Sequence, residues 1–159
     1  MKRNIYLDFS YLLVLAASFG AVLVLGVIVA PIVFHTDILP VDILIDKYNA
    51  GIVMAEIFHR FSYWLYVVVL YVAVYESIAY KTAKRDPIVL ASASLVLFAS
   101  LMFSVVYAPK ILSMQALGKE ATLSDTFVNI HLAAEIDFKL LAVSLLVLFI
   151  RRLMLLKID

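Results

Sequence analysis

Two short polar segments, each set beside or inside a long apolar run, carry the side chains of this sequence that could do chemistry. Their residues are Glu56, His59, Arg60, His131, Glu135, Asp137 and Lys139. Imidazole and carboxylate groups on facing bundle helices can ligate a metal ion, and two facing histidines can ligate haem. Histidine also changes its charge near neutral pH. The two segments therefore predict a polar layer that binds a ligand.

The candidate metal ligands in this layer are His59, His131 and Glu135, and the bound group would be a transition metal or a haem held by the two histidines. Sites of this kind in helix bundles use tight pairs such as Glu-x-x-His or His-x-x-x-His. The sequence contains one Glu-x-x-His pair, Glu56 with His59, and no His-x-x-x-His pair, so the ligand spacing alone does not specify a metal.

A structural interpretation of the same charges stays open. Glu56 with Arg60, and Glu135 with Lys139, are pairs four residues apart in the favoured acid-first order. Each glutamate can then neutralise the base on its own helix without any ligand. Asp137 lies on a different face of its helix and has no such partner in the sequence.

Long apolar helices must position these residues. Of the 159 residues, 65% are hydrophobic, which is far more than a soluble domain contains. A helix that crosses a bilayer needs roughly 20 largely apolar residues, and four windows qualify, at residues 9–34, 54–80, 88–109 and 127–150. The sequence predicts an all-α fold, a four-helix transmembrane bundle that forms a single integral membrane domain in the lipid bilayer.

The two halves of the chain repeat one order of features. A basic pair, an apolar run ending in Ala-Pro, and an Ala-Glu-Ile triplet with a basic residue four positions after the glutamate occur twice, at offsets between 78 and 82 residues. The copies are Lys2-Arg3, Ala30-Pro31, Ala55-Glu56-Ile57 and Arg60, then Lys84-Arg85, Ala108-Pro109, Ala134-Glu135-Ile136 and Lys139. We predict a tandem repeat of a two-helix hairpin, at about residues 1–80 and 81–159.

Lysine and arginine near the ends of the windows predict the orientation of the chain, because such residues stay on the cytoplasmic side. Those at one face are Lys2, Arg3, Lys81, Lys84, Arg85, Arg151, Arg152 and Lys157. Both termini are then cytoplasmic in a bacterial inner membrane, and the two polar connections lie outside. Glu76, near the cytoplasmic end, is interpreted as reaching toward the lysines there. A net charge of +1 gives no reason to expect a nucleic-acid partner.

The first apolar window also carries a resemblance to a known family. It contains Gly20 and Gly26 and closes in Val-Ala-Pro-Ile-Val-Phe at Val29–Phe34. With the four-helix plan, this segment resembles the bacterial relatives of transmembrane protein 205, which are four-span membrane proteins grouped as a domain of unknown function. The resemblance implies the fold and a membrane location and assigns no catalytic residue. A weaker likeness to four-span copper-resistance and haem-handling proteins transfers no ligand.

The polar layer predicts a small outward-opening cavity that binds or passes a cation or a small solute. Because the four windows use nearly the whole chain, no soluble catalytic domain fits, and this argues against most enzyme classes. Two alternatives stay open. One is an accessory or assembly subunit whose small-residue helix faces dock onto a larger membrane complex. The other is a haem- or metal-binding membrane protein that uses the outer histidines. A homodimer is a further partner expectation, because four short spans enclose little volume.

Overall fold

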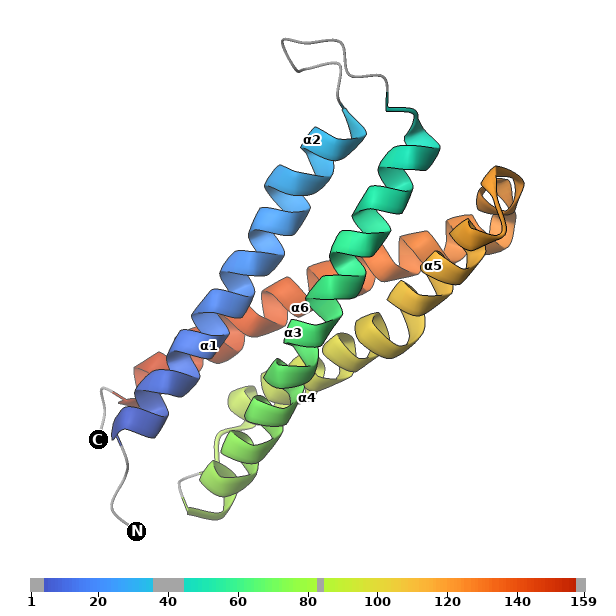
Figure 1. Cartoon of the computed structure of the whole chain (residues 1–159). Helices are drawn as coiled ribbons and strands as arrows, with labels where there is room; N and C mark the ends of the chain where they lie inside the picture. The colour runs from blue at the N-terminus through green and yellow to red at the C-terminus, as the bar shows by residue number, and fades with distance from the viewer. Residues whose placement is uncertain (1–4, 36–44, 83–84, 157–159) are drawn as a thin grey trace.

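The computed structural model describes residues 5–35, 45–82 and 85–156, and within these ranges the chain forms helices and their connections with no strand. The predicted all-α class is therefore confirmed. Four long helical segments run up and down (Figure 1). They are α1 (Ile5–Leu23) continued by η1 (Val24–Val29) and α2 (Ala30–Phe34); α3 (Lys47–Thr82); α4 (Pro87–Leu101) continued by η3 (Met102–Tyr107) and α5 (Ala108–Ala116); and, after the short η4 (Lys119–Leu123), α6 (Asp125–Leu156).

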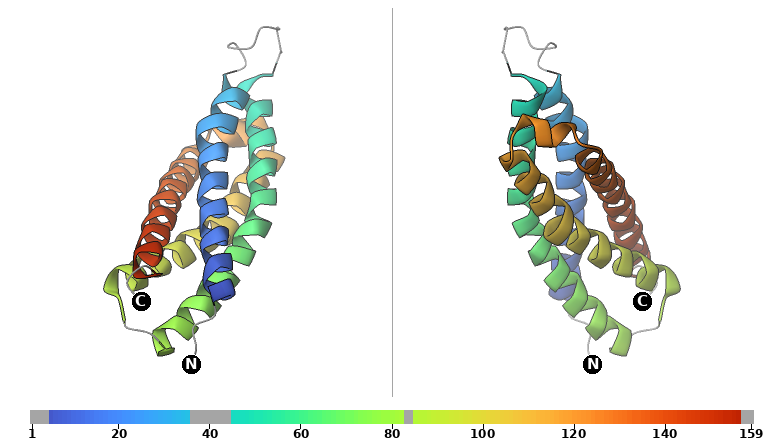
Figure 2. Two further views of the ribbon diagram at one scale, coloured as in Figure 1. Left: turned by 90° about the vertical axis from the view of Figure 1, so that its left-hand side faces the viewer. Right: turned by 90° about the vertical axis from the view of Figure 1, so that its right-hand side faces the viewer.

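Each long segment packs against two neighbours. α1 contacts α3 and α6, and α4 contacts α3 and α6, so the four segments surround one central core (Figure 2). Leu15, Leu65, Val68, Val96 and Leu141 are fully buried there. The core comes from all four segments, because each buries one of its apolar faces against its neighbours.

The bundle has two chemically different ends. At the connection end, α2 finishes, α3 begins, and α5, η4 and the start of α6 meet; at the terminal end, α1 begins, α3 finishes, α4 begins and α6 finishes (Figure 1). Of the predicted cytoplasmic bases, Lys81, Arg85, Arg151 and Arg152 lie at the terminal end. Lys2, Arg3, Lys84 and Lys157 fall outside the described residues.

A widened helical turn precedes each of the two Ala-Pro pairs. In η1 and η3 the backbone follows π-helical geometry, and the N–H groups of Ala30 and Ala108 bond the carbonyls of Leu25 and Phe103, five residues back. A proline ring clashes with the carbonyl four residues before it and offers no N–H. Shifting the hydrogen bonds by one residue lets the helix pass each proline without ending there.

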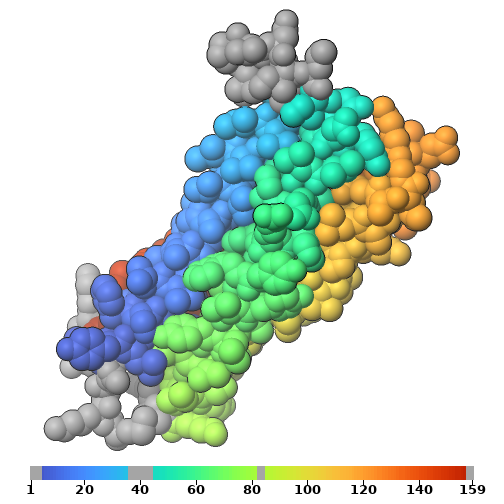
Figure 3. All heavy atoms as spheres, viewed as in Figure 1, coloured from blue at the N-terminus to red at the C-terminus, as the bar shows by residue number. Residues whose placement is uncertain are grey.

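The apolar surface agrees with a membrane location. Three segments, Ile5–Phe34, Lys47–Lys81 and Pro87–Ala116, are long and apolar enough to cross a bilayer. The fourth, α6, carries Glu135, Asp137 and Lys139 near its middle and Arg151 and Arg152 near its end, so its longest run without a charge is residues 140–150. Large apolar side chains point outward on all four segments; examples are Leu13, Leu70, Phe98 and Val143. Figure 3 shows the face on which α1, α3 and α4–α5 lie side by side.

Candidate functional site

A large cavity lies toward the connection end, among α1–α2, α3, α5, η4 and α6. Its volume is about 810 Å³, within the range of sites that hold small organic ligands. The cavity forms because α2 and the start of α6 lie apart at this end (Figure 1), whereas α1 and α6 pack closely toward the terminal end.

The deep part of the cavity is apolar. Phe58 from α3, Phe103 from η3 and Phe138 from α6 meet with ring centroids 5.1 to 5.5 Å apart. Gly26 lies opposite Phe138, and a Cβ added there would be 3.7 Å from the Phe138 ring. Glycine at this position therefore leaves space open beside the aromatic rings, although the backbone conformation there is one that any residue can adopt.

The mouth of the cavity is polar and mostly basic. It is lined by His35 at the end of α2, Lys47 at the start of α3, Lys119 in η4 and His131 in α6. Lys119 lies 3.6 Å from a carboxylate oxygen of Asp46. The pKa of Asp46 lies below its usual value, chiefly because the backbone N–H of Asn49 donates to it and secondarily because of the nearby Lys119 charge.

Gln115, at the end of α5, places an amide on the cavity wall. Its side chain is only 7% exposed, and among the described residues nothing bonds its Oε1 atom. The phenolic hydroxyl of Tyr48 donates to the Gln115 backbone carbonyl at 2.9 Å and holds this turn against α3. The backbone of this turn is thus held against α3, and the Gln115 amide has hydrogen-bonding capacity left over.

Three of the sequence-predicted residues line the cavity, and all three come from α6. They are His131, Glu135 and Lys139. Lys139 donates to Glu135 at 2.6 Å, and the His131 ring lies parallel to Phe127 with centroids 6.0 Å apart. The wall that they form is therefore polar, and the charge of Glu135 on it is neutralised by Lys139.

The predicted residues on α3 do not line the cavity in the part of the chain that the structure describes. Arg60 donates to Glu56 at 2.7 Å on the exposed face of α3. His59 Nε2 lies 3.3 Å from the Tyr63 hydroxyl, and its buried Nδ1 has no partner within the described ranges. Both glutamates thus make the intrahelical pairs that the structural interpretation of the charges predicted.

Asp137 is 6% exposed, and its Oδ2 atom has no partner among the residues that the structure describes. It does not line the cavity. Those same residues contain no group of three or more histidine, aspartate or glutamate side chains that could hold a metal ion. Metal or haem binding by His59, His131 and Glu135 stays a prediction.

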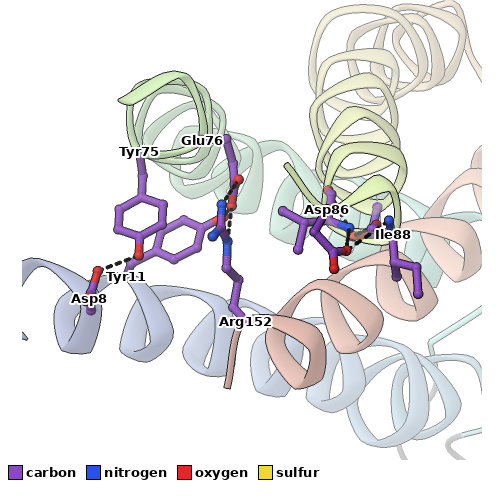
Figure 4. A network of polar contacts seen from close by, with 9 residues as sticks. Asp8, Tyr11, Tyr75, Glu76, Asp86, Ile88 and Arg152 are labelled. Atoms are coloured by element: carbon purple, nitrogen blue, oxygen red, sulfur yellow. Dashed lines mark hydrogen bonds and ion pairs between the residues drawn. The ribbon is translucent and has the colours of Figure 1, made fainter. Parts of the chain in front are cut away.

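A second polar cluster, the terminal-end network, joins three helices (Figure 4). Glu76 of α3 accepts from Tyr11 of α1 at 2.6 Å and from Arg152 of α6, which binds both carboxylate oxygens and contacts one of them at 2.9 Å. Tyr75 donates to Asp8 at 2.6 Å, and its ring stacks on Tyr11 with centroids 3.7 Å apart. The interpretation of Glu76 as reaching toward the lysines is wrong, because its partners are an arginine and a tyrosine.

Beside this network, Asp86 connects the start of α4 to α6. It accepts from the backbone N–H groups of Ile88 and Val89 at 3.0 Å and from Arg151 at 2.6 and 3.0 Å. The pKa of Asp86 lies below its usual value, chiefly because of the hydrogen bond from the Arg151 guanidinium. Asp86 is therefore both an N-cap and an interhelical ion-pair partner.

Sequence reasoning missed the terminal-end network because its members are far apart in the chain. The positions of these residues along their helices could have indicated the network. Asp8 and Glu76 are the acids of the apolar helices that lie nearest the basic end, and Arg152 lies at the same end. Acids in such positions need a cationic or hydroxyl partner from another helix.

Comparison with known proteins gives a family and no relative of known activity. No curated protein matches the chain, and no solved structure matches it. A family model matches residues 13–120, which include α3, α4, α5 and most of α1 and end before α6. The chain belongs to the family described as "Domain of unknown function (DUF4149)".

Proposed function

We propose that this protein is a membrane protein that binds an apolar or amphiphilic small molecule in the cavity at the connection end. The observation that carries the proposal is the cavity itself, about 810 Å³ in volume and walled deep inside by Phe58, Phe103 and Phe138. Pockets of this size with apolar walls and a few fixed polar groups are the usual form of small-molecule sites.

The sequence-based hypothesis named a cation or a small solute as the ligand, and the cavity supports a small solute better than a cation. A bare cation needs several oxygen or imidazole ligands at once. The acid on the wall, Glu135, is already bonded to Lys139, and the mouth carries Lys47 and Lys119. Basic groups at the entrance disfavour a cation and leave organic solutes as the better candidates.

Our proposal for the membrane arrangement has four spans, with α6 as the fourth, in a bacterial inner membrane. Lys81, Arg85, Arg151 and Arg152 at the terminal end favour a cytoplasmic location for that end. The cavity would then open on the outer side, and because α2 and α6 lie apart there, it would also be reachable from the outer leaflet.

Two finer sequence-based proposals concern the repeat and the family likeness, and an observation supports the first. The π-helical turns η1 and η3 begin 78 residues apart and each ends directly before an Ala-Pro pair, as a duplicated hairpin requires. The likeness to relatives of transmembrane protein 205 is not tested by the match to a family of unknown function. Both remain proposals.

The experiment is a fluorescence titration of purified protein in amphipol with a neutral probe, the methyl ester of 11-(dansylamino)undecanoic acid. Protein-free amphipol gives the background partition of the probe. We expect saturable binding at about one probe per chain. Gly26→Phe and Ala142→Phe, which fill the cavity from opposite walls, should each weaken binding about tenfold or more.

The matched control is Leu13→Phe, because Leu13 lies on α1 with an exposed side chain and does not line the cavity in the described part of the chain. It should leave probe affinity unchanged. The proposal would be refuted if the probe partitioned without saturation. It would also be refuted if all three variants kept a cooperative thermal transition and bound the probe equally well.

A further inference from the structure

We propose that the ligand of the cavity is a single-chain amphiphile with an anionic head group, which Lys47, Lys119 and the Gln115 amide bind at the mouth. This inference rests on the proposed function and names its substrate class. The apolar chain would occupy the deep part of the cavity beside Gly26, Phe58 and Phe138. No separate site elsewhere in the molecule is required.

The charge of the mouth supports an anion. Lys47 makes no hydrogen bond or ion pair within the described residues, and Lys119 has only a distant partner in Asp46, at 3.6 Å. His35 and His131 line the same entrance and add proton donors. Hydrogen bonds from lysine to a carboxylate or phosphate are among the stronger ones in proteins, and a membrane interface supplies such head groups.

Among the described residues that line the cavity, Glu135 is the one acid, and it does not cancel this charge. Glu135 is held by Lys139 at 2.6 Å, deeper along α6, so that pair is nearly neutral. Asp46 is shared between the Asn49 backbone, at 2.8 Å, and Lys119. The exposed Lys47 is left without an acidic partner among the described residues, and a ligand head group at the mouth would supply one.

Gln115 provides the second, independent observation. The residue is 93% removed from solvent and lines the cavity, yet in the described part of the chain its Oε1 atom has no partner. A buried amide with free hydrogen-bonding capacity is unusual in a native structure and indicates a missing partner. Because the oxygen and nitrogen of an amide can exchange places, it can present its NH₂ to a carboxylate or phosphate oxygen.

The volume sets the size of the ligand. At about 30 Å³ for each non-hydrogen atom with its hydrogens, the share of one water molecule in the liquid, about 810 Å³ holds roughly 27 such atoms. That number suits a fatty acid or a lysophospholipid of medium chain length. A two-chain phospholipid has about twice as many atoms and would not fit inside.

The experiment compares two probes that differ only in their head group, 11-(dansylamino)undecanoic acid and its methyl ester, on the same amphipol-solubilised protein. The acid should bind about tenfold more tightly than the ester, and added salt should reduce that difference. In Lys47→Ala/Lys119→Ala the acid should lose about tenfold in affinity and the ester should change less than twofold. Gln115→Leu should weaken the acid severalfold.

The matched control is Lys110→Ala, because Lys110 is an exposed lysine of α5 that does not line the cavity among the described residues. It should change neither affinity. Competition by oleate and by lysophosphatidic acid distinguishes a carboxylate from a phosphate as the preferred head group. Displacement by one or both supports the inference, and displacement by neutral monoolein alone overturns it.

The two proposals fail in different ways. If neither dansyl probe binds saturably, the proposed function is wrong and the anionic class falls with it. If acid and ester bind equally, and the double lysine variant behaves as the unchanged protein does, the cavity still binds a small molecule and only the anionic head group is refuted.

Discussion

Hydrogen-bond partners decide whether a buried carboxylate stabilises this protein. Asp8 is 8% exposed and accepts from Tyr75 at 2.6 Å, whereas Asp137 is 6% exposed and its Oδ2 lacks a partner in the described part of the chain. A buried polar group without a hydrogen bond costs roughly 1 to 3 kcal/mol, and one with a good bond costs far less. The same substitution should therefore act in opposite directions at these positions.

We expect Asp137→Asn to raise the free energy of unfolding by about 1 kcal/mol, because it removes a carboxylate that the core does not bind. Asp8→Asn should lower it by about 1 to 2 kcal/mol, because a charged acceptor of the Tyr75 hydroxyl is replaced. Thermal unfolding in detergent measures both. A destabilised Asp137→Asn would indicate that the carboxylate has a specific partner and would support its place among the predicted site residues.

Asp86 makes a prediction about pH, because it lies between α3 and α4 and outside the apolar spans. Its folded-state pKa lies below the unfolded value, near 4. A group with a lowered folded pKa adds stability above the unfolded pKa, and this stability is lost as pH falls through the folded pKa. At pH values below about 4, the melting temperature of the protein should fall, and protonation of Asp86 should cause part of that fall.

Asp86→Ala should lower stability at pH 7 by about 1 kcal/mol or more, from loss of the cap and of the Arg151 pair. Below the folded pKa of Asp86 the difference from the unchanged protein should shrink. Glu120→Gln, which alters an exposed acid in η4, serves as the control and should follow the unchanged protein at every pH. A constant difference across pH would contradict the assigned role of the carboxylate.

At the level of the elements, the two π-helical turns set the register of the residues that follow them. After η3 the register of α5 is shifted, and α5 ends in Gln115 on the cavity wall. Without Pro109 the turn can return to ordinary α-helical bonds, which would rotate the later residues by about 100°. Gln115 would then leave the cavity.

Pro109→Ala should thus raise the melting temperature, by the equivalent of about 1 kcal/mol, and weaken binding of the dansyl acid severalfold. Pro87→Ala is the matched control, since Pro87 occupies the first turn of α4, where an N–H has no intrahelical acceptor. That control should change neither quantity appreciably. If Pro87→Ala weakened binding, or if Pro109→Ala left binding unchanged, the π-helical turn would not be what positions the binding site.

At the level of the whole molecule, the terminal-end network holds α1, α3 and α6 together at the end of the bundle opposite the cavity. Glu76 and Arg152 have side chains that are each 14% exposed and join α3 to α6, and Tyr11 adds α1. Removing one partner leaves the other charge buried and unpaired, which is far more costly than losing an exposed pair. The network therefore sets the separation of the helices at this end.

Arg152→Ala should lower the free energy of unfolding by about 3 kcal/mol, and adding Glu76→Gln should recover part of that loss. Arg60→Ala breaks the exposed pair with Glu56 and should cost less than about 1 kcal/mol. A double-mutant cycle on thermal or denaturant unfolding tests this. Equal losses for Arg152→Ala and Arg60→Ala would show that the buried pair gives no special stability.

Orientation is testable directly, because the chain contains no cysteine. Glu120→Cys, at the connection end, should react with a membrane-impermeant maleimide in intact cells. Lys81→Cys, at the terminal end, should react only after the membrane is permeabilised, because the basic end is expected to face the cytoplasm. The reverse pattern would invert the proposed topology and place the cavity mouth inside the cell.

The sequence by itself determined the all-α class, the approximate extent of the helices and the intrahelical pairs. These features follow from local periodicity and composition, which each residue carries with it. Glu56 with Arg60 and Glu135 with Lys139 are visible as spacing of four residues along one helix.

Only the tertiary structure decided which helix faces meet. It placed His131 on the cavity wall and His59 away from it, although both lie at helix ends that look equivalent in the sequence. It also joined Glu76 to Arg152, which are 76 residues apart, and left the oxygen of the Gln115 amide, a residue of the cavity wall, without a partner among the described residues. Such contacts depend on the rotation and crossing of whole helices, and a helical period fixes neither of them.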